Sequence, residues 1–188
     1  MKPWFRWNET DAEDGKIVVP YTFHANFPWR EEVNAAISEM NDDLGCIKIV
    51  HVPEEQVSMN GAPFTFGIVV AFEDVTGSGC YSAIGIAPGF IGRSPVNSIT
   101  EFNVPSVWQV LSLGGITQSR CRGWQKSTIK HEFMHVMGVH HEHNRPGRER
   151  FLNVDLDATD VDHNFALMTM GSDTEWNTWA SFTELLLQ

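Results

Sequence analysis

Apolar residues gather in short runs through the first two thirds of the chain, and each run ends at a residue that turns or breaks it. The length of these runs and their content of β-branched residues predict strands. They are residues 16–23, 46–52, 66–72 and 107–113. Pro20 lies inside the first run and predicts an edge position or a bend, because proline donates no hydrogen bond to a strand ladder.

Two segments have the helical period instead. The first has one apolar face, made by Val33, Ile37, Met40 and Leu44. The second spans residues 127–137 and has an apolar face made by Ile129, Phe133 and Val136. Between the strands, Gly77, Gly79 and Gly85 predict a turn around Cys80, and residues 86–105 have the composition of a loop. Strands followed by a helix with polar chemistry predict an α+β domain.

Composition narrows the class of protein. The chain has 188 residues, 42% of them hydrophobic, which suits one folded domain. Its net charge of -11 gives it no electrostatic reason to bind nucleic acid or an anionic membrane surface. No apolar run approaches the roughly 20 residues of a membrane span. No apolar signal-peptide core follows the N-terminus, so the sequence taken literally predicts a cytosolic protein. A mature domain or a fragment of a longer chain is the alternative, and other features favour it.

Candidate chemistry is concentrated on the second helix. His131 and His135 are four residues apart, so they stack on one helix face, where two imidazoles can reach one metal ion. Glu132 lies on the flank of that face, where a carboxylate can take a proton from water. The spacing therefore predicts a helix that is apolar behind and binds metal in front.

A third histidine follows beyond a predicted helix stop. Gly138 can adopt positive φ and end the helix, after which His141 can return as a third ligand. Three protein ligands leave one position open for water, as in catalytic zinc sites. An ordinary amphipathic helix with exposed histidines and a closed structural zinc site remain the alternatives. The remaining histidines have no ligand spacing and are interpreted as ordinary polar residues: His24, His51, His140, His143 and His163.

The segment His131-Glu132-x-x-His135-x-x-Gly138-x-x-His141-Glu142 resembles the metzincin signature, and Glu142 with Arg145 is similar to the astacin branch. Shorter stretches along residues 7–165 resemble that family in the same order. They are Val19-Pro20-Tyr21, Cys46-Ile47, Gly79-Cys80-Tyr81-Ser82, Gln109-Val110-Leu111-Ser112-Leu113 and Cys121 ahead of the helix. The chain is therefore identified as a member of the astacin family of zinc metalloendopeptidases.

The resemblance implies a fold, a cofactor and a substrate class. The expected domain covers residues 1–188, with an N-terminal subdomain at about 7–138, built on a twisted, mixed five-stranded sheet, and a partial C-terminal subdomain at 139–188. One Zn²⁺ is expected on His131, His135 and His141, with Glu132 activating the bound water to hydrolyse peptide bonds of a peptide or protein substrate. The strand near residues 107–113 is expected to be the sheet edge that pairs with that substrate.

The same resemblance implies a Cys80–Cys121 disulfide and a secreted protein. The family cysteine that would pair with Cys46 is absent from the three in this sequence. The family's methionine turn and its zinc-binding tyrosine are also expected after His141, but no tyrosine follows that residue. Met168 and Met170 do not match the turn. The alternative to an active peptidase is therefore a weak or inactive zinc-binding fragment, and a C-terminal subdomain that is incomplete is expected.

Overall fold

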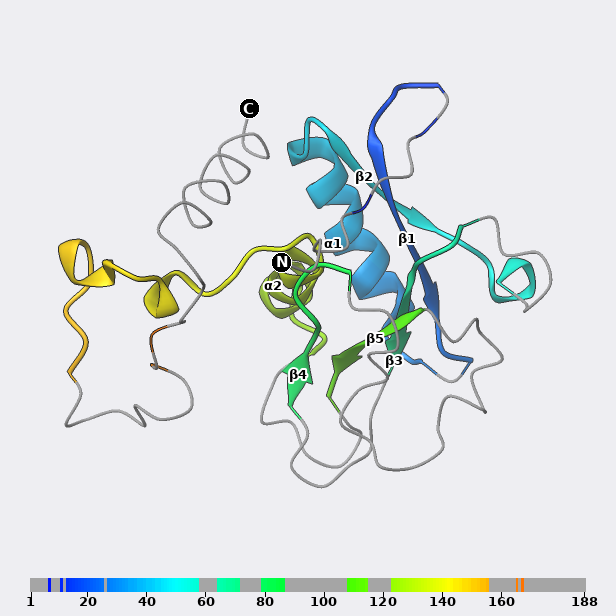
Figure 1. Ribbon diagram of the computed structural model, residues 1–188. Helices are drawn as coiled ribbons and strands as arrows, with labels where there is room; N and C mark the ends of the chain where they lie inside the picture. The colour runs from blue at the N-terminus through cyan, green and yellow to red at the C-terminus, as the bar shows by residue number, and fades with distance from the viewer. Residues whose placement is uncertain are drawn as a thin grey trace. The chain divides into compact units, whose positions relative to one another are not determined.

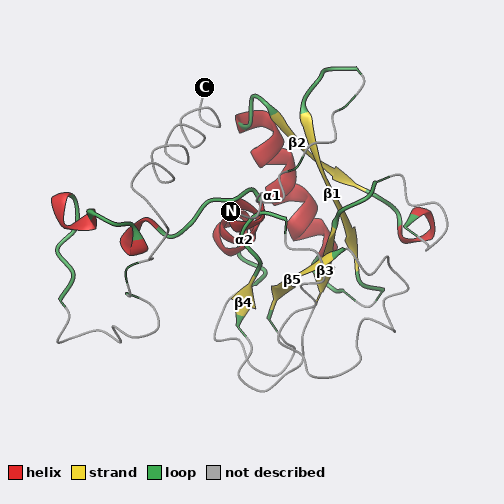
Figure 2. Ribbon diagram, viewed as in Figure 1, coloured by secondary structure: helices red, strands yellow, loops and turns green. Residues whose placement is uncertain are grey.

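Five strands and two α-helices form the part of the chain that the structure describes (Figures 1 and 2). The computed structural model describes residues 7, 11, 13–25, 27–57, 64–71, 79–86, 108–114, 123–155, 165 and 167. The strands are β1 (Ile17–Phe23), β2 (Ile47–His51), β3 (Ile68–Ala71), β4 (Cys80–Tyr81) and β5 (Gln109–Leu113). The helices are α1 (Arg30–Asp43) and α2 (Lys126–Val136), with 3-10 turns η1 (Glu54–Gln56), η2 (Glu142–Asn144) and η3 (Arg148–Arg150).

The sheet is mixed, with strand order β2-β1-β3-β5-β4. The first four strands in that order pair in parallel, and β4 pairs antiparallel to β5. Every residue of β3 and β5 is buried, as expected of strands covered on both faces. The predicted α+β class and the mixed five-stranded sheet are therefore confirmed.

The predicted edge position of residues 107–113 is wrong. These residues form β5, which lies between β3 and β4, so the sheet's edges among the described residues are β2 and β4. The true edge strand, β4, is only two residues long and falls where sequence analysis expected a turn. Gln109 and Ser112 on β5 are buried, as expected of an interior strand. The Gln109 amide donates to the Gly85 carbonyl, and the Ser112 hydroxyl donates to the Gly79 carbonyl.

Pro20 also departs from its predicted edge position, since β1 lies between β2 and β3. The backbone N–H of Ile17 donates to Cys46 on the β2 side, and that of His24 donates to Val70 on the β3 side. Because successive N–H groups alternate in direction, the nitrogen of Pro20 faces the β3 side. Pairing with β3 begins only at Tyr21, so Pro20 removes no ladder hydrogen bond.

Helix α1 packs on the sheet through its predicted apolar face. Val33, Ala36, Ile37 and Met40 are buried, and Leu44 is buried just beyond the helix. The Asn41 side chain accepts from the Ile49 N–H at 2.8 Å and donates to the Ile49 carbonyl at 2.9 Å. Those two backbone groups face away from β1, so Asn41 covers part of the open edge of β2.

Two ion pairs connect α1 to α2. Glu39 on α1 accepts from Lys126, and the Lys130 ammonium lies 2.9 Å from the other oxygen of the same carboxylate. The two helices are also in direct contact, and α2 contacts β4 and β5. The helix that carries the candidate chemistry is therefore joined to both the sheet and α1.

By compactness the chain divides into two units, Met1–Gly138 and Val139–Gln188. The first holds the sheet and both α-helices, and the second holds η2 and η3. That these units are subdomains of one catalytic domain stays a prediction. Within the described residues, no helix is both long and apolar enough to cross a membrane.

Candidate metal centre

Two histidines on one face of α2 approach each other: His131 is exposed and His135 is buried. Nε2 of His131 and Nε2 of His135 lie 3.1 Å apart, and the two rings meet at an interplanar angle of 78°. With metal–nitrogen bonds of about 2.0–2.1 Å, two ligands of a tetrahedral zinc site lie about 3.3 Å apart. The separation of the two nitrogens therefore matches that of a bound pair.

His141 completes a group of three. His131, His135 and His141 each offer one ligand atom, and these atoms all lie within 4.8 Å of one another. Within the described residues, this is the one group of three or more histidine, cysteine or acidic side chains that could hold a metal ion. Three imidazoles form a donor set that suits zinc, so the residues present fit that ion.

The opposite face of α2 anchors the helix in the core. Ile129, Phe133 and Val136 are fully buried, as their spacing predicts. The Phe133 ring packs edge-on against Tyr21 of β1 at 5.8 Å between centroids. Gly138 ends the helical path with φ 101°, a backbone conformation that favours glycine. The predicted helix stop is thus confirmed, and it turns the chain toward His141.

Glu132 is almost completely buried beside the two helical histidines, with 4% of its surface exposed. Its Oε2 atom has no hydrogen-bond partner among the described residues. Burial raises the pKa of this carboxyl to about 7, and a hydrogen bond from the Ser82 side chain opposes that rise. A buried carboxyl with a pKa near neutrality can both accept and return a proton at neutral pH.

Residues after β4 bind the backbone of α2, a connection that sequence analysis missed. The Ser82 hydroxyl donates to the Glu132 carbonyl at 2.8 Å, and the Gly85 N–H donates to the His135 carbonyl at 2.9 Å. The Gln109 amide on β5 donates in turn to the Gly85 carbonyl at 3.0 Å. A glutamine at the start of a largely apolar strand was the sequence signal, because a buried amide requires a partner. The segment therefore fixes the helix turn that carries Glu132 and His135.

A second backbone restraint comes from the N-terminal region. The indole N–H of Trp7 donates to the Val136 carbonyl at 2.9 Å. Val136 is the last residue of α2, and the carbonyls of the last helical turn receive no hydrogen bond from an N–H group of the helix. Trp7 thus satisfies one of these groups next to the turn at Gly138.

The predicted cysteine pair lies only partly within the described residues. Cys80 is on β4, and Cys121, Met168 and Met170 lie outside the described part of the chain. His163 lies outside it as well. Of the histidines interpreted as ordinary polar residues, His51 packs between Tyr21 and Phe23 at the end of β2. Its pKa is lowered, mainly by burial.

The part of the chain that carries this site is similar to a known protein family. The family model described as Astacin (Peptidase family M12A) matches residues 107–180, which include the three histidines and Glu132. Residues 107–180 of the chain thus match the astacin family. The resemblance seen in the sequence motifs is thereby confirmed.

Individual astacin relatives and one solved structure are similar to the chain. Zinc metalloproteinase nas-5 of Caenorhabditis elegans is 24% identical over 151 residues, 79% of this chain and 33% of that protein. Protein SpAN of Strongylocentrotus purpuratus is 34% identical over 103 residues, 54% of this chain and 13% of that protein. The chain thus spans a third or less of these curated relatives.

The astacin-like fold is supported by a solved structure. High choriolytic enzyme 1, a hatching enzyme zinc-protease from Oryzias latipes, superimposes with a TM-score of 0.59 at 20% identity. The match covers 89% of this chain and 68% of that one. At this identity the likeness concerns the fold, and it agrees with the mixed sheet and two helices described above.

Proposed function

We propose that this chain is the catalytic domain of a zinc-dependent metalloendopeptidase. His131, His135 and His141 hold one Zn²⁺, and Glu132 is the general base. The observation that carries the proposal is the grouping of three histidine ligand atoms within 4.8 Å beside a buried glutamate. The astacin match over the same residues supports it.

The chemistry divides between the ion and the chain. When bound, zinc supplies a Lewis acid that polarises the scissile carbonyl and makes water easier to deprotonate. Glu132 accepts the proton of the attacking water and then returns it to the departing amine. Its burial keeps bulk water away from the carboxyl, and Ser82 holds its main chain in place. Because this helix turn is held in place, the general base Glu132 keeps a constant position relative to the metal ligands.

The substrate is an extended polypeptide segment that adds to the sheet at β4. This strand is an edge of the sheet, pairs antiparallel with β5 and contacts α2, which carries the candidate metal ligands. Strand addition gives affinity through main-chain hydrogen bonds whatever the side chains are. The other edge, β2, is partly covered by Asn41, which favours β4 as the binding edge.

A disulfide between Cys80 and Cys121 and an extracellular location belong to the same proposal. In support, the resemblance to the astacin family implies this pairing, and a disulfide persists in an oxidising compartment such as the extracellular space. The bond would tie the edge strand β4 to the residues that lead into α2. Non-reducing peptide mapping is expected to recover a peptide that joins Cys80 to Cys121, and a peptide that joins Cys46 to either would contradict it.

Metal analysis combined with a hydrolysis assay tests the proposal. The purified chain is expected to contain one zinc per molecule and to cleave an unstructured protein, with cleavage lost to a chelator and recovered on adding zinc. His135→Ala should lose most of the zinc, because only two ligands remain, whereas His24→Ala should retain it. Undiminished zinc in His135→Ala would contradict the ligand set. Zinc without any cleavage would indicate a zinc-binding module instead.

A further inference from the structure

The third histidine of the metal centre lies outside the helix that orders the other two. His141 is exposed, and its backbone is extended at φ -65° and ψ 123°. The Asn144 N–H donates to its carbonyl at 3.0 Å, which restrains the main chain. Since a side chain loses rotamer freedom when it binds a metal, a contact that already holds the ring of a ligand increases the affinity for the ion.

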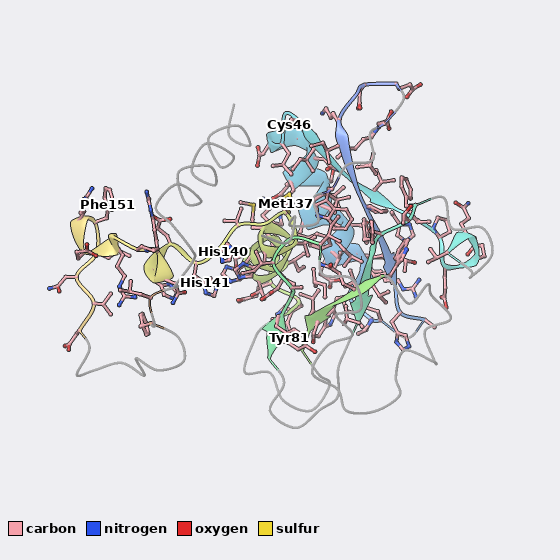
Figure 3. The ribbon with its side chains drawn as sticks, viewed as in Figure 1. Cys46, Tyr81, Met137, His140, His141 and Phe151 are labelled. Atoms are coloured by element: carbon pink, nitrogen blue, oxygen red, sulfur yellow. The ribbon has the colours of Figure 1, made fainter. Side chains whose placement is uncertain are left out.

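An aromatic column supplies such a contact. The rings of His141 and His143 are stacked, with centroids 4.9 Å apart and an interplanar angle of 20°. The other neighbour of His143 is Phe165, whose ring centroid lies 5.0 Å away. His143 is therefore the middle member of a column that runs from Phe165 to the predicted zinc ligand. Figure 3 labels His141, where the chain leaves α2.

Arg148 holds the column together through the backbone. Its Nη1 group donates to the His143 carbonyl at 2.6 Å and also to the Phe165 carbonyl. The Arg148 carbonyl accepts from the N–H groups of Phe151 and Leu152 at 2.8 Å each, which fixes the main chain of the arginine. A planar guanidinium that joins two distant carbonyls keeps both rings at a set spacing, a task that a lysine ammonium performs less well.

We propose that His143 is a positioning residue that presets the His141 ring for the metal, with Arg148 and Phe165 as its support. The inference rests on the proposed function, since it assumes a metal on His131, His135 and His141. Stacked aromatic pairs contribute an effect worth roughly three- to tenfold in a binding constant. The column therefore acts on zinc affinity and not on the chemistry at Glu132.

Zinc affinity measured by chelator competition on the whole chain tests this assignment. His143→Ala is expected to bind zinc roughly three- to tenfold more weakly, whereas His143→Phe, which keeps a stacking ring, should bind as the unmodified chain does. Arg148→Lys should also weaken binding. Glu149→Gln, on the exposed side of the same turn, is the matched control and should leave affinity unchanged.

The outcomes of these measurements show whether the positioning role of His143 or the proposed function itself is wrong. Equal affinity of His143→Ala and the unmodified chain would overturn the positioning role. Weakening of His143→Phe to the level of His143→Ala would overturn it too, since the stack would then not be what matters. If the unmodified chain binds no zinc, the proposed function fails, and this inference fails with it. Thermal unfolding of the metal-free variants shows whether a loss of affinity is instead a loss of folding.

Discussion

At the scale of single residues, one face of α2 carries the candidate metal ligands and the opposite face packs in the core. Its histidines point to the candidate metal centre, while Phe133 is fully buried behind them against Tyr21. The metal-binding face can be ordered only if the apolar face holds the helix against the sheet, because short helices are marginal without tertiary packing. Stability and ligand geometry therefore depend on different residues of the same eleven-residue helix.

Phe133→Ala tests that division. The substitution removes a fully buried ring and leaves a cavity, so the free energy of unfolding should fall by about 3–5 kcal/mol. Ser127→Ala, at an exposed position of the same helix, should change it by less than about 0.5 kcal/mol. Urea denaturation of the metal-free proteins measures both. A loss for Phe133→Ala no larger than for Ser127→Ala would show that this face does not anchor α2.

At the scale of elements, α1 and α2 are joined by one carboxylate. Hydrogen bonds from Lys126 first, and from Lys130 second, lower the pKa of Glu39 below its ordinary value of 4.5. A carboxyl whose pKa is lower in the folded state stabilises the fold above its unfolded pKa and loses that effect as the pH falls through the folded one. The contact is exposed, so added salt should weaken it.

Glu39→Gln should therefore lower the thermal midpoint at neutral pH and low salt. The difference from the unmodified chain should shrink as the pH falls from 4.5, the ordinary pKa, through the lower pKa that Glu39 has in the folded protein. Glu31→Gln, an exposed residue in the first turn of α1, serves as the control. Thermal unfolding followed by circular dichroism across this pH range provides the measurement. A pH-independent difference would show that the charge of Glu39 plays no part.

Most elements are predictable from the sequence because the burial of their residues follows the periods that strands and helices impose. The run Gln109–Leu113 was recognised as a strand, but its place in the sheet was not, since strand order depends on contacts between distant segments. The two-residue strand β4 is too short for any period to be visible. The histidine group was predictable because its spacing lies within one helix and the turn that follows it.

The supports of the site were not predictable in the same way. Ser82 and Gly85 donate to backbone carbonyls of α2, and Gln109 donates to the Gly85 carbonyl. The buried glutamine indicates that a partner is needed, but the sequence does not show which backbone carbonyl accepts. The ring contacts of His143 with His141 and Phe165 were likewise not predicted, because the sequence indicated only an ordinary polar residue at position 143. The chemistry of a site is thus easier to predict from local spacing than the contacts that hold it.

At the scale of the whole molecule, a residue near the N-terminus reaches the end of α2. The Trp7 indole donates to the Val136 carbonyl, far along the chain, immediately before the turn that leads to His141. This hydrogen bond closes the largest loop among those described for the helix. The N-terminal region should therefore stabilise the last helical turn.

Trp7→Phe should loosen that turn while retaining the aromatic ring. Loss of one half-buried hydrogen bond should cost about 1 kcal/mol of unfolding free energy. Hydrogen exchange of the amides of Met137 and Gly138 should become faster than in the unmodified chain, since local opening needs less free energy. Trp124→Phe, at a position that is 42% exposed, provides the comparison. Unchanged exchange at the end of α2 would contradict the role of Trp7.

The central claim is that three histidines hold zinc while Glu132 performs the proton transfer without binding the metal. Parallel measurement of zinc content and peptide hydrolysis in Glu132→Gln tests it most directly. The amide preserves the size of the side chain but accepts no proton, so zinc should remain at one per chain while hydrolysis falls by at least about a hundredfold. Hydrolysis that persists in a zinc-loaded, chelator-sensitive Glu132→Gln protein would contradict the account, as would loss of the zinc.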